Sequence, residues 1–185
     1  MCGIVGYTGF QDAYQVVING LRRLEYRGYD SAGIVLDSDS DFQVAKTKGK
    51  VSDLMAISED LIGKAHVGMG HTRWATHGVP SDRNSHPHVS NNGKIAVVHN
   101  GIIENYDTIK IMLTEKGFTF QSETDTEVLV NLIQYFMDIN ADIDFPTAVR
   151  YALNEVYGAY AITVMHDDFP GILVVARLGS PLAIG

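Results

Sequence analysis

The chain has 185 residues, of which 45% are hydrophobic and 19% charged, and its formal net charge is -8 at pH 7. This length and composition fit one globular domain with its own core. The negative charge argues against nucleic acid as a partner, and no apolar run is long enough to cross a membrane. A single cysteine allows no internal disulfide, so we expect a cytoplasmic protein.

The first third of the sequence alternates between strand-like and helix-like patterns. It predicts a strand at 4–8, a helix at 11–25 and two strands at 33–36 and 42–48. An acidic, hairpin-like turn separates these two strands. A short helix is expected near 52–62.

The middle of the chain holds its longest irregular stretch. A strand is predicted at 67–73, and residues 76–94 then show almost no apolar periodicity. Loops of this length in compact domains are often functional. The next strand, at 94–99, is expected to end at Asn100-Gly101, a pair that is typical of hairpin turns.

The second half of the chain is mainly helical before it returns to strands. Helices are predicted at 105–116, 125–138 and 146–156, and paired strands at 159–165 and 172–176. Strands near both ends with helices between them favour an α+β fold with layered antiparallel sheets over a regular βαβ repeat.

The last residues of the sequence, 180–185, look like the start of another strand. No linker or internal repeat divides the chain. We therefore expect a single domain over 1–185 that is truncated at its C-terminus and belongs to a longer protein.

Cys2 is the first candidate for chemistry. Removal of Met1 would leave a residue that carries a thiol and a primary amine on one Cα. Near pH 7 such an amine is partly neutral and can accept a proton, so it can activate the thiol for acyl transfer. An isolated Cys2 would more often be a small buried apolar residue at a strand end.

Four further residues suit acyl transfer and the binding of an amino acid. Asn100 and Gly101 offer two donors for an oxyanion, and Arg73 offers a guanidinium for a carboxylate. Asp125 follows Thr124 in a helical first turn, where an exposed carboxylate would bind an ammonium group. Each position also has a structural explanation: a hairpin turn, an arginine that covers its neighbour, and favourable placement in the helix dipole.

Seven histidines raise the question of a metal site. Only His86 and His88 are close in sequence, and no helical pair of histidines is spaced for zinc. A structural metal domain built from His86, His88 and His99 remains an alternative, but we expect no metal and no cofactor. The glycines match neither a nucleotide-binding loop nor a dinucleotide-binding motif.

Five motifs together resemble the class II glutamine amidotransferase domain of the N-terminal nucleophile hydrolase superfamily. They are CGIVG at 2–6, LEYRGYDSAG at 24–33, GHTRWATHG at 70–78, HNGIIENY at 99–106 and SETDTE at 122–127. They occur in the order of the family and span most of the chain. The resemblance implies a four-layer αββα sandwich of two antiparallel sheets.

The resemblance also implies catalytic roles. Cys2 would be the nucleophile and its own amine the base, while the Asn100 side chain and the Gly101 N–H would form the oxyanion hole. Attack on the glutamine side-chain amide would release ammonia and leave a γ-glutamyl thioester, which water would convert to glutamate.

Further residues match positions that hold glutamine in the family. Arg73, with Thr76 and His77, would bind the α-carboxylate, and Asp125 the α-ammonium group. Trp74 matches part of a flap over residues 73–81 that closes on the substrate.

Three other matching residues would have supporting roles. Arg27 would support the nucleophile end of the site, and His86 and His99 would order the loop and the structure around it.

The residues of these motifs are most similar to those of the hexosamine branch of this family. That resemblance implies a C-terminal sugar-isomerase domain, missing here, which would use the ammonia on fructose 6-phosphate, within a homodimer. Two alternatives remain open: a phosphoribosylpyrophosphate-type amidotransferase, and a catalytically silent glutamine-binding module that keeps Met1.

Overall fold

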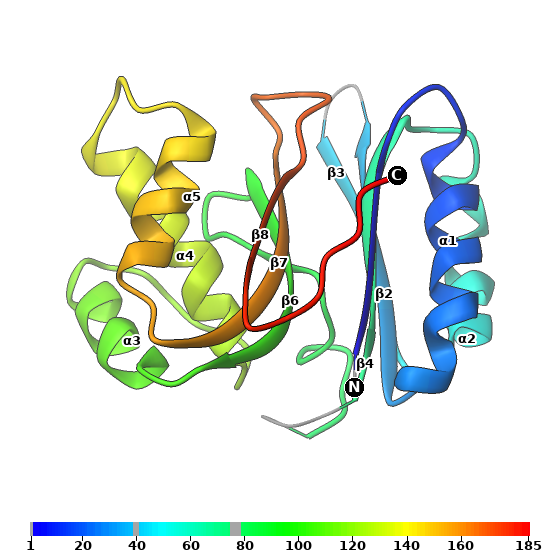
Figure 1. Cartoon of the computed structure of the whole chain (residues 1–185), viewed down its shortest axis with the longest axis horizontal. Helices are drawn as coiled ribbons and strands as arrows, with labels where there is room; N and C mark the ends of the chain where they lie inside the picture. The colour runs from blue at the N-terminus through cyan, green and yellow to red at the C-terminus, as the bar shows by residue number, and fades with distance from the viewer. Residues whose placement is uncertain (1, 39–40, 75–78) are drawn as a thin grey trace.

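The computed structural model describes residues 2–38, 41–74 and 79–185. In these ranges the chain forms two four-stranded antiparallel sheets, with strand orders β1-β4-β2-β3 (sheet A) and β5-β6-β7-β8 (sheet B). The sheets lie face to face, and helices cover the outer face of each one (Figure 1). This confirms the predicted α+β class and the αββα order of layers.

Sheet A and its two helices come from the first 73 residues. The strands are β1 (Gly3–Thr8), β2 (Ser31–Ser38), β3 (Asp41–Lys48) and β4 (Val67–Arg73). The helices are α1 (Ala13–Leu24) and α2 (Val51–Ile57). Asp12 caps α1 by accepting a hydrogen bond from the Tyr14 N–H. Apolar residues of α1 and α2, including Val17, Leu21 and Leu54, pack against the outer face of the sheet.

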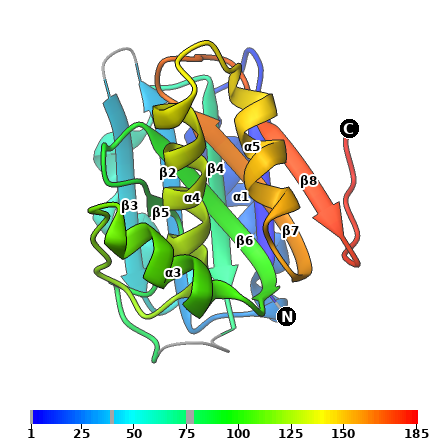
Figure 2. The same ribbon diagram turned by 90° about the vertical axis from the view of Figure 1, so that its left-hand side faces the viewer.

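Sheet B and its helices come from the rest of the chain. The strands are β5 (His88–Val89), β6 (Ile95–Ile103), β7 (Gly158–His166) and β8 (Val174–Leu178). The helices are α3 (Tyr106–Glu115), α4 (Asp125–Ile139) and α5 (Phe145–Asn154). All three helices lie on the outer side of this sheet (Figure 2).

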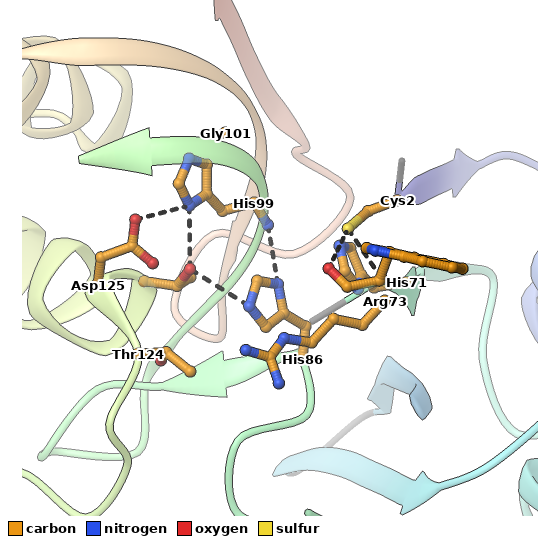
Figure 3. Close-up of a pocket in the computed structure, with 10 residues that line it drawn as sticks. Cys2, His71, Arg73, His86, His99, Gly101, Thr124 and Asp125 are labelled. Atoms are coloured by element: carbon orange, nitrogen blue, oxygen red, sulfur yellow. Dashed lines mark hydrogen bonds and ion pairs between the residues drawn. The ribbon is translucent and has the colours of Figure 1, made fainter. Parts of the chain in front are cut away.

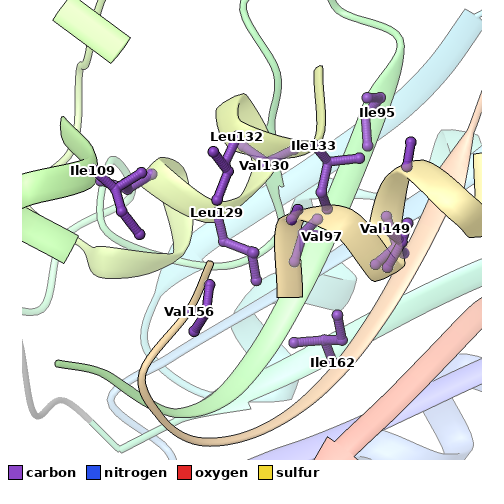
Figure 4. Close-up of a cluster of buried hydrophobic side chains, with 14 of the residues drawn as sticks. Ile95, Val97, Ile109, Leu129, Val130, Leu132, Ile133, Val149, Val156 and Ile162 are labelled. Atoms are coloured by element: carbon purple, nitrogen blue, oxygen red, sulfur yellow. The ribbon is translucent and has the colours of Figure 1, made fainter. Parts of the chain in front are cut away.

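The largest apolar cluster joins these helices to sheet B. Leu129 and Ile133 of α4 and Val149 of α5 pack with Val97 and Ile162 of the sheet (Figure 4). Burial of one such side chain contributes about 1.5–3 kcal/mol. The helical periodicity of the apolar residues therefore places α4 and α5 against the sheet.

A smaller apolar cluster holds the two sheets together. Val35 and Met69 of sheet A pack with Ala96, Val98 and Met165 of sheet B. Through this contact β4 and β6 become neighbours, although they belong to different sheets. The final residues of both strands then lie on the same side of the molecule, where the candidate site forms.

Most predicted elements are confirmed, and the predicted hairpins pair as expected. β2 and β3 are joined in the register Ser38↔Asp41, and β7 and β8 in the register Ala161↔Arg177. Residues 39 and 40 of the first turn lie outside the described residues.

The expected turn at Asn100-Gly101 is wrong. β6 continues through both residues to Ile103, and they pair with Ala161 and Tyr160 of β7. The local Asn-Gly signal is overridden because β7 supplies a partner for the whole length of β6.

Three other predicted boundaries also differ. The helix expected near 52–62 ends at Ile57, and a 3₁₀ turn at Glu59–Leu61 follows it. The long loop contains the short strand β5. Residues 181–185 form no strand, because no described strand pairs with them. None of the helices in the described ranges is long and apolar enough to cross a membrane.

Candidate active site

A small pocket lies where sheet A, sheet B and α4 meet (Figure 3). Cys2 lies just before β1, and Arg73 and Trp74 lie at the end of β4. Gly101 comes from β6 and Asp125 from the first turn of α4. The cavity measures about 30 Å³, room for roughly one water molecule. His86 and His99 line it as well, so seven of the residues predicted from the sequence line one pocket.

Strand pairing places Cys2 beside Arg73. The antiparallel register of β1 and β4 pairs Gly3 with Thr72, so the next residues along, Cys2 and Arg73, face each other. The Cys2 Sγ accepts a hydrogen bond from the Trp74 N–H at 3.2 Å and lies 3.5 Å from the Trp74 carbonyl oxygen. The thiol is half-buried at the edge of the pocket.

Arg73 is a buried cation, with only 5% of its surface exposed. Burial lowers the pKa of its guanidinium, and the nearby acidic groups of Cys2, Asp125 and Asp30 oppose that shift. Its backbone is held from the other side, because its carbonyl oxygen accepts a hydrogen bond from the Asp30 N–H at 3.0 Å. A fixed positive charge thus lies between the nucleophile candidate and the candidate ammonium-binding carboxylate.

Asn100 links the two sheets at the pocket. Its Nδ2 donates to the Cys2 carbonyl oxygen at 3.3 Å, and its Oδ1 lies 2.8 Å from the Nε2 of His71. The next residue, Gly101, has a φ of 139°, and a Cβ there would collide with the carbonyl group of Ala159. Only glycine suits this position.

Asp125 is buried rather than exposed, contrary to the expectation from the sequence. Only 6% of its surface is exposed. One carboxylate oxygen, Oδ2, accepts a hydrogen bond from the Ile103 N–H at 2.8 Å and lies 3.9 Å from the Nδ1 of His99. The carboxylate is therefore held at the pocket by β6 as well as by its own helix.

The start of α4 has the first half of a capping box but not the second. The Thr124 Oγ1 accepts a hydrogen bond from the Glu127 N–H at 3.4 Å. The Glu127 carboxylate, however, accepts from the N–H groups of Gln121 and Ser122 at 2.8 and 2.6 Å. These bonds fix the segment that leads into Asp125.

Four buried histidines pack behind the pocket. The rings of His71 and His86 lie 4.2 Å apart, and those of His86 and His88 lie 4.9 Å apart. The His99 N–H donates to the Nδ1 of His86 at 3.2 Å, and the Thr126 hydroxyl lies within 3.3 Å of a ring nitrogen of both residues.

Burial keeps these histidines neutral. It lowers the pKa of His71 to about 3 and the pKa values of His86 and His88 well below 6.5. Burial also lowers the pKa of His99, which the charge of Asp125 opposes. Imidazoles without charge can stack closely and act as directional donors and acceptors.

The loop that carries His86 is held against sheet A. A Cβ on Gly33 of β2 would collide with the His86 carbonyl oxygen, so glycine permits this close approach. Lys46 of β3 donates from its Nζ to the carbonyl oxygens of Ser85 and Pro87 at 3.2 and 3.3 Å. Burial lowers the pKa of this lysine, and Glu127 and Asp82 oppose the shift.

The histidine cluster does not have the arrangement of a metal centre. Among the described residues, no group of three or more histidine, cysteine, aspartate or glutamate side chains is placed to hold a metal ion. Instead, both ring nitrogens of His86, the Nε2 of His88 and the Nδ1 of His99 face threonine hydroxyls or backbone groups.

Two of the predicted residues in the described ranges do not line the pocket. Asn100 is bonded to Cys2 and His71, which do line it. The second is Arg27. It ends a 3₁₀ turn, Glu25–Arg27, and is not one of the described residues that line the pocket. Gly28, the next residue, packs closely on the backbone of Arg73 and Trp74. Thr76 and His77 lie outside the described residues.

Three further residues line the pocket that the sequence did not predict as site residues: His71, Thr124 and Thr126. A signal for His71 was present: it lies two residues before Arg73 in a predicted strand, so both side chains point to the same face. Thr126 lies next to Asp125 in the motif, but nothing local shows that its hydroxyl faces His86 and His99.

The sequence of the chain is similar to that of known proteins. Residues 57–177 match the glutamine amidotransferase domain family. Glutamine–fructose-6-phosphate aminotransferase (isomerizing) from Bacteroides thetaiotaomicron is 54% identical over 188 aligned positions, and the enzyme from Caldanaerobacter subterraneus subsp. tengcongensis is 50% identical over 185. Both alignments cover 100% of this chain, but the chain spans only about 30% of each relative's length.

A solved structure shows the same fold. Glutamine phosphoribosylpyrophosphate amidotransferase from B. subtilis superposes with a TM-score of 0.76 and 29% sequence identity, over 90% of this chain and 35% of the other. The family match covers well over half of the chain and includes Arg73, Asn100, Gly101 and Asp125. The chain thus belongs to the glutamine amidotransferase domain family.

Proposed function

We propose that this chain hydrolyses the side-chain amide of L-glutamine to glutamate and ammonia, with Cys2 as the nucleophile. The observation that carries the proposal is the convergence of Cys2, Arg73, Gly101 and Asp125 on one pocket, from four separate elements. A nucleophile and two opposite charges at one cavity suit a zwitterionic amino acid whose side chain reaches the thiol.

In the proposed reaction the Cys2 amine, freed by loss of Met1, takes the thiol proton. The sulfur attacks the amide carbon, and the resulting oxyanion is stabilised by the Asn100 Nδ2 and the Gly101 N–H. Collapse breaks the C–N bond, and the amine gives its proton to the departing ammonia. Water then attacks the thioester and releases glutamate, which restores the thiol. These steps require no cofactor.

The charges of the pocket suit the two ends of the substrate backbone. Arg73, together with Thr76 and His77, would bind the α-carboxylate, and Asp125 would bind the α-ammonium group. Trp74, which is 46% exposed at the pocket, would cover the bound glutamine. A cavity of about 30 Å³ is too small for glutamine, so binding requires side chains at the pocket mouth to move.

Supporting roles follow for three further residues. Arg27 would hold the turn next to the backbone of Arg73 and Trp74. His86 and His99 would order the pocket wall through their bonds to Thr126.

For the whole protein, we infer the hexosamine reaction. Relatives with 50% identity or more are named glutamine–fructose-6-phosphate aminotransferase, whereas the phosphoribosylpyrophosphate enzyme is 29% identical. The domain at 1–185 would deliver ammonia to a C-terminal sugar-isomerase domain that binds fructose 6-phosphate, in a cytoplasmic homodimer. Full-length protein that aminates fructose 6-phosphate with glutamine would support this assignment, and amination of phosphoribosylpyrophosphate would contradict it.

The decisive test replaces the nucleophile. Cys2→Ala should abolish ammonia release, because no thioester forms, while calorimetry should still detect glutamine binding. A diazoketone analogue of glutamine should label Cys2 in the unsubstituted chain, as seen by peptide mass analysis. Full glutamine hydrolysis by Cys2→Ala would rule out the mechanism.

Intact mass separates the enzyme from a silent glutamine-binding module. A mass without Met1, together with glutaminase activity, supports the proposed amine base. A chain that binds glutamine, keeps Met1 and releases no ammonia would be a binding module.

A further inference from the structure

His71 occupies a position between the candidate oxyanion donor and the buried histidine cluster. Its Nε2 lies 2.8 Å from the Oδ1 of Asn100, and its ring stacks on that of His86 at 4.2 Å with a tilt of 31°. The side chain is 1% exposed, and its Nδ1 makes no hydrogen bond with the described residues. The Asn100 amide therefore makes the side-chain hydrogen bond of this ring, and the backbone of His99 is a second polar group close to it.

This contact determines which end of the Asn100 amide faces Cys2. A carbonyl oxygen accepts but cannot donate, so a neutral His71 must carry its proton on Nε2 to bond the Oδ1. The amide Nδ2 then points to the other side, where it donates to the Cys2 carbonyl oxygen at 3.3 Å. The reversed amide would bring its Oδ1 against the Cys2 oxygen, two acceptors with no proton between them.

We propose that His71 is a positioning residue for catalysis: its Nε2–H holds the Asn100 amide with the Nδ2 directed at the nucleophile. The inference rests on the proposed function, because it assigns Asn100 to the oxyanion hole. In this proposal His71 acts through Asn100 rather than through a contact of its own with the reacting atoms. The stacked ring of His86 keeps the imidazole in the plane that this bond requires.

The effect should fall on the chemical step. An oxyanion donor acts on charge that develops in the transition state, and loss of one such donor reduces kcat by about 100–1,000-fold. Loss of its positioning partner leaves the amide in place but free to turn. His71→Phe, which keeps an aromatic ring against His86, should therefore lower kcat by about 10–100-fold and leave the KM for glutamine within about two-fold.

A double-mutant cycle separates positioning from general support of the fold. If His71 acts only through Asn100, His71→Phe should have little further effect on kcat in an Asn100→Ala background. As the matched control, His88→Phe removes a histidine of the same cluster that does not contact Asn100, and its effect should combine additively with that of Asn100→Ala. Additive effects of His71→Phe and Asn100→Ala would refute the positioning role.

A second variant and a measurement without turnover complete the test. His71→Gln places an amide N–H close to the position of Nε2 and should recover at least part of the lost kcat, even if the phenylalanine variant does not fold. In ¹⁵N-labelled protein, NMR of the histidine rings should find the His71 proton on Nε2. A proton on Nδ1 would overturn the inference. An inactive unsubstituted chain would instead contradict the proposed function, and the NMR result would still decide the His71 contact.

Discussion

At the scale of single residues, the pocket contains two buried charged side chains, Asp125 and Arg73. Asp125 and Arg73 are 6% and 5% exposed, and burial of charge is costly unless partners compensate. Asp125 accepts one backbone hydrogen bond, from Ile103, and lies near the neutral His99. Arg73 is the positive group near this carboxylate, and a ligand ammonium group would be a second one.

Asp125→Asn tests this role with little change of shape. The asparagine oxygen can still accept from the Ile103 N–H, so the free energy of unfolding should change little. Loss of the charge should raise the KM for glutamine about 10–100-fold, because this change corresponds to the free energy of one charge-assisted hydrogen bond. Steady-state glutaminase assays provide the measurement. Asp107→Asn, an exposed residue in the first turn of α3, is the control and should leave the KM unchanged.

At the scale of elements, β6 sets the position of both proposed oxyanion donors, Asn100 and Gly101. The strand does not turn at Asn100-Gly101 but passes through it, paired with β7. Gly101 keeps that pairing because it tolerates a positive φ and leaves room for the Ala159 carbonyl. The same pair of residues that locally suggests a hairpin is, in the sheet, a site of close backbone approach.

Gly101→Ala should therefore be strongly destabilising. It combines a strained φ, which costs about 1–3 kcal/mol, with a collision that forces β6 and β7 apart. Gly117→Ala is the matched control, because Gly117 also has a positive φ, 93°, but has open space around a Cβ. Urea unfolding should show a loss for Gly101→Ala that exceeds that of Gly117→Ala by at least about 2 kcal/mol. Equal losses of unfolding free energy would mean that only the strained φ destabilises the variants, without a contribution from the collision with Ala159.

At the scale of the whole molecule, the histidine cluster links folding to pH. His71, His86, His88 and His99 are buried with lowered pKa values, whereas unfolding exposes them to water, where a histidine pKa is about 6.5. The unfolded chain binds more protons below that pH. The contribution of these residues to stability is therefore complete above pH 6.5 and is lost as the pH falls.

We expect the free energy of unfolding to decrease between pH 7 and pH 5. His71, with a pKa of about 3, should alone account for about 2 kcal/mol at pH 5. Urea denaturation at several pH values measures the slope. Exchange of a buried histidine, as in His88→Gln, should flatten that slope, whereas His66→Gln, at an exposed position, should not. A slope that His88→Gln leaves unchanged would contradict the neutral cluster.

The sequence by itself determined the element types, the αββα class and the family of the chain. Periodicity places the helices and strands because side-chain burial repeats every 3.6 or 2 residues. The five motifs, taken in their order, identify Cys2, Arg73, Asn100 and Asp125. Local patterns nevertheless misjudged the Asn100-Gly101 strand and the exposure of Asp125.

Only the tertiary structure decided how these residues meet. Cys2 and Asn100 are 98 residues apart and belong to different sheets, and they come together because the apolar cluster between the sheets brings β4 and β6 into contact. The same packing buries His71 against Asn100 and Asp125 against β6. Such contacts depend on which faces become buried together, and that is a property of the assembled layers rather than of any local run of residues.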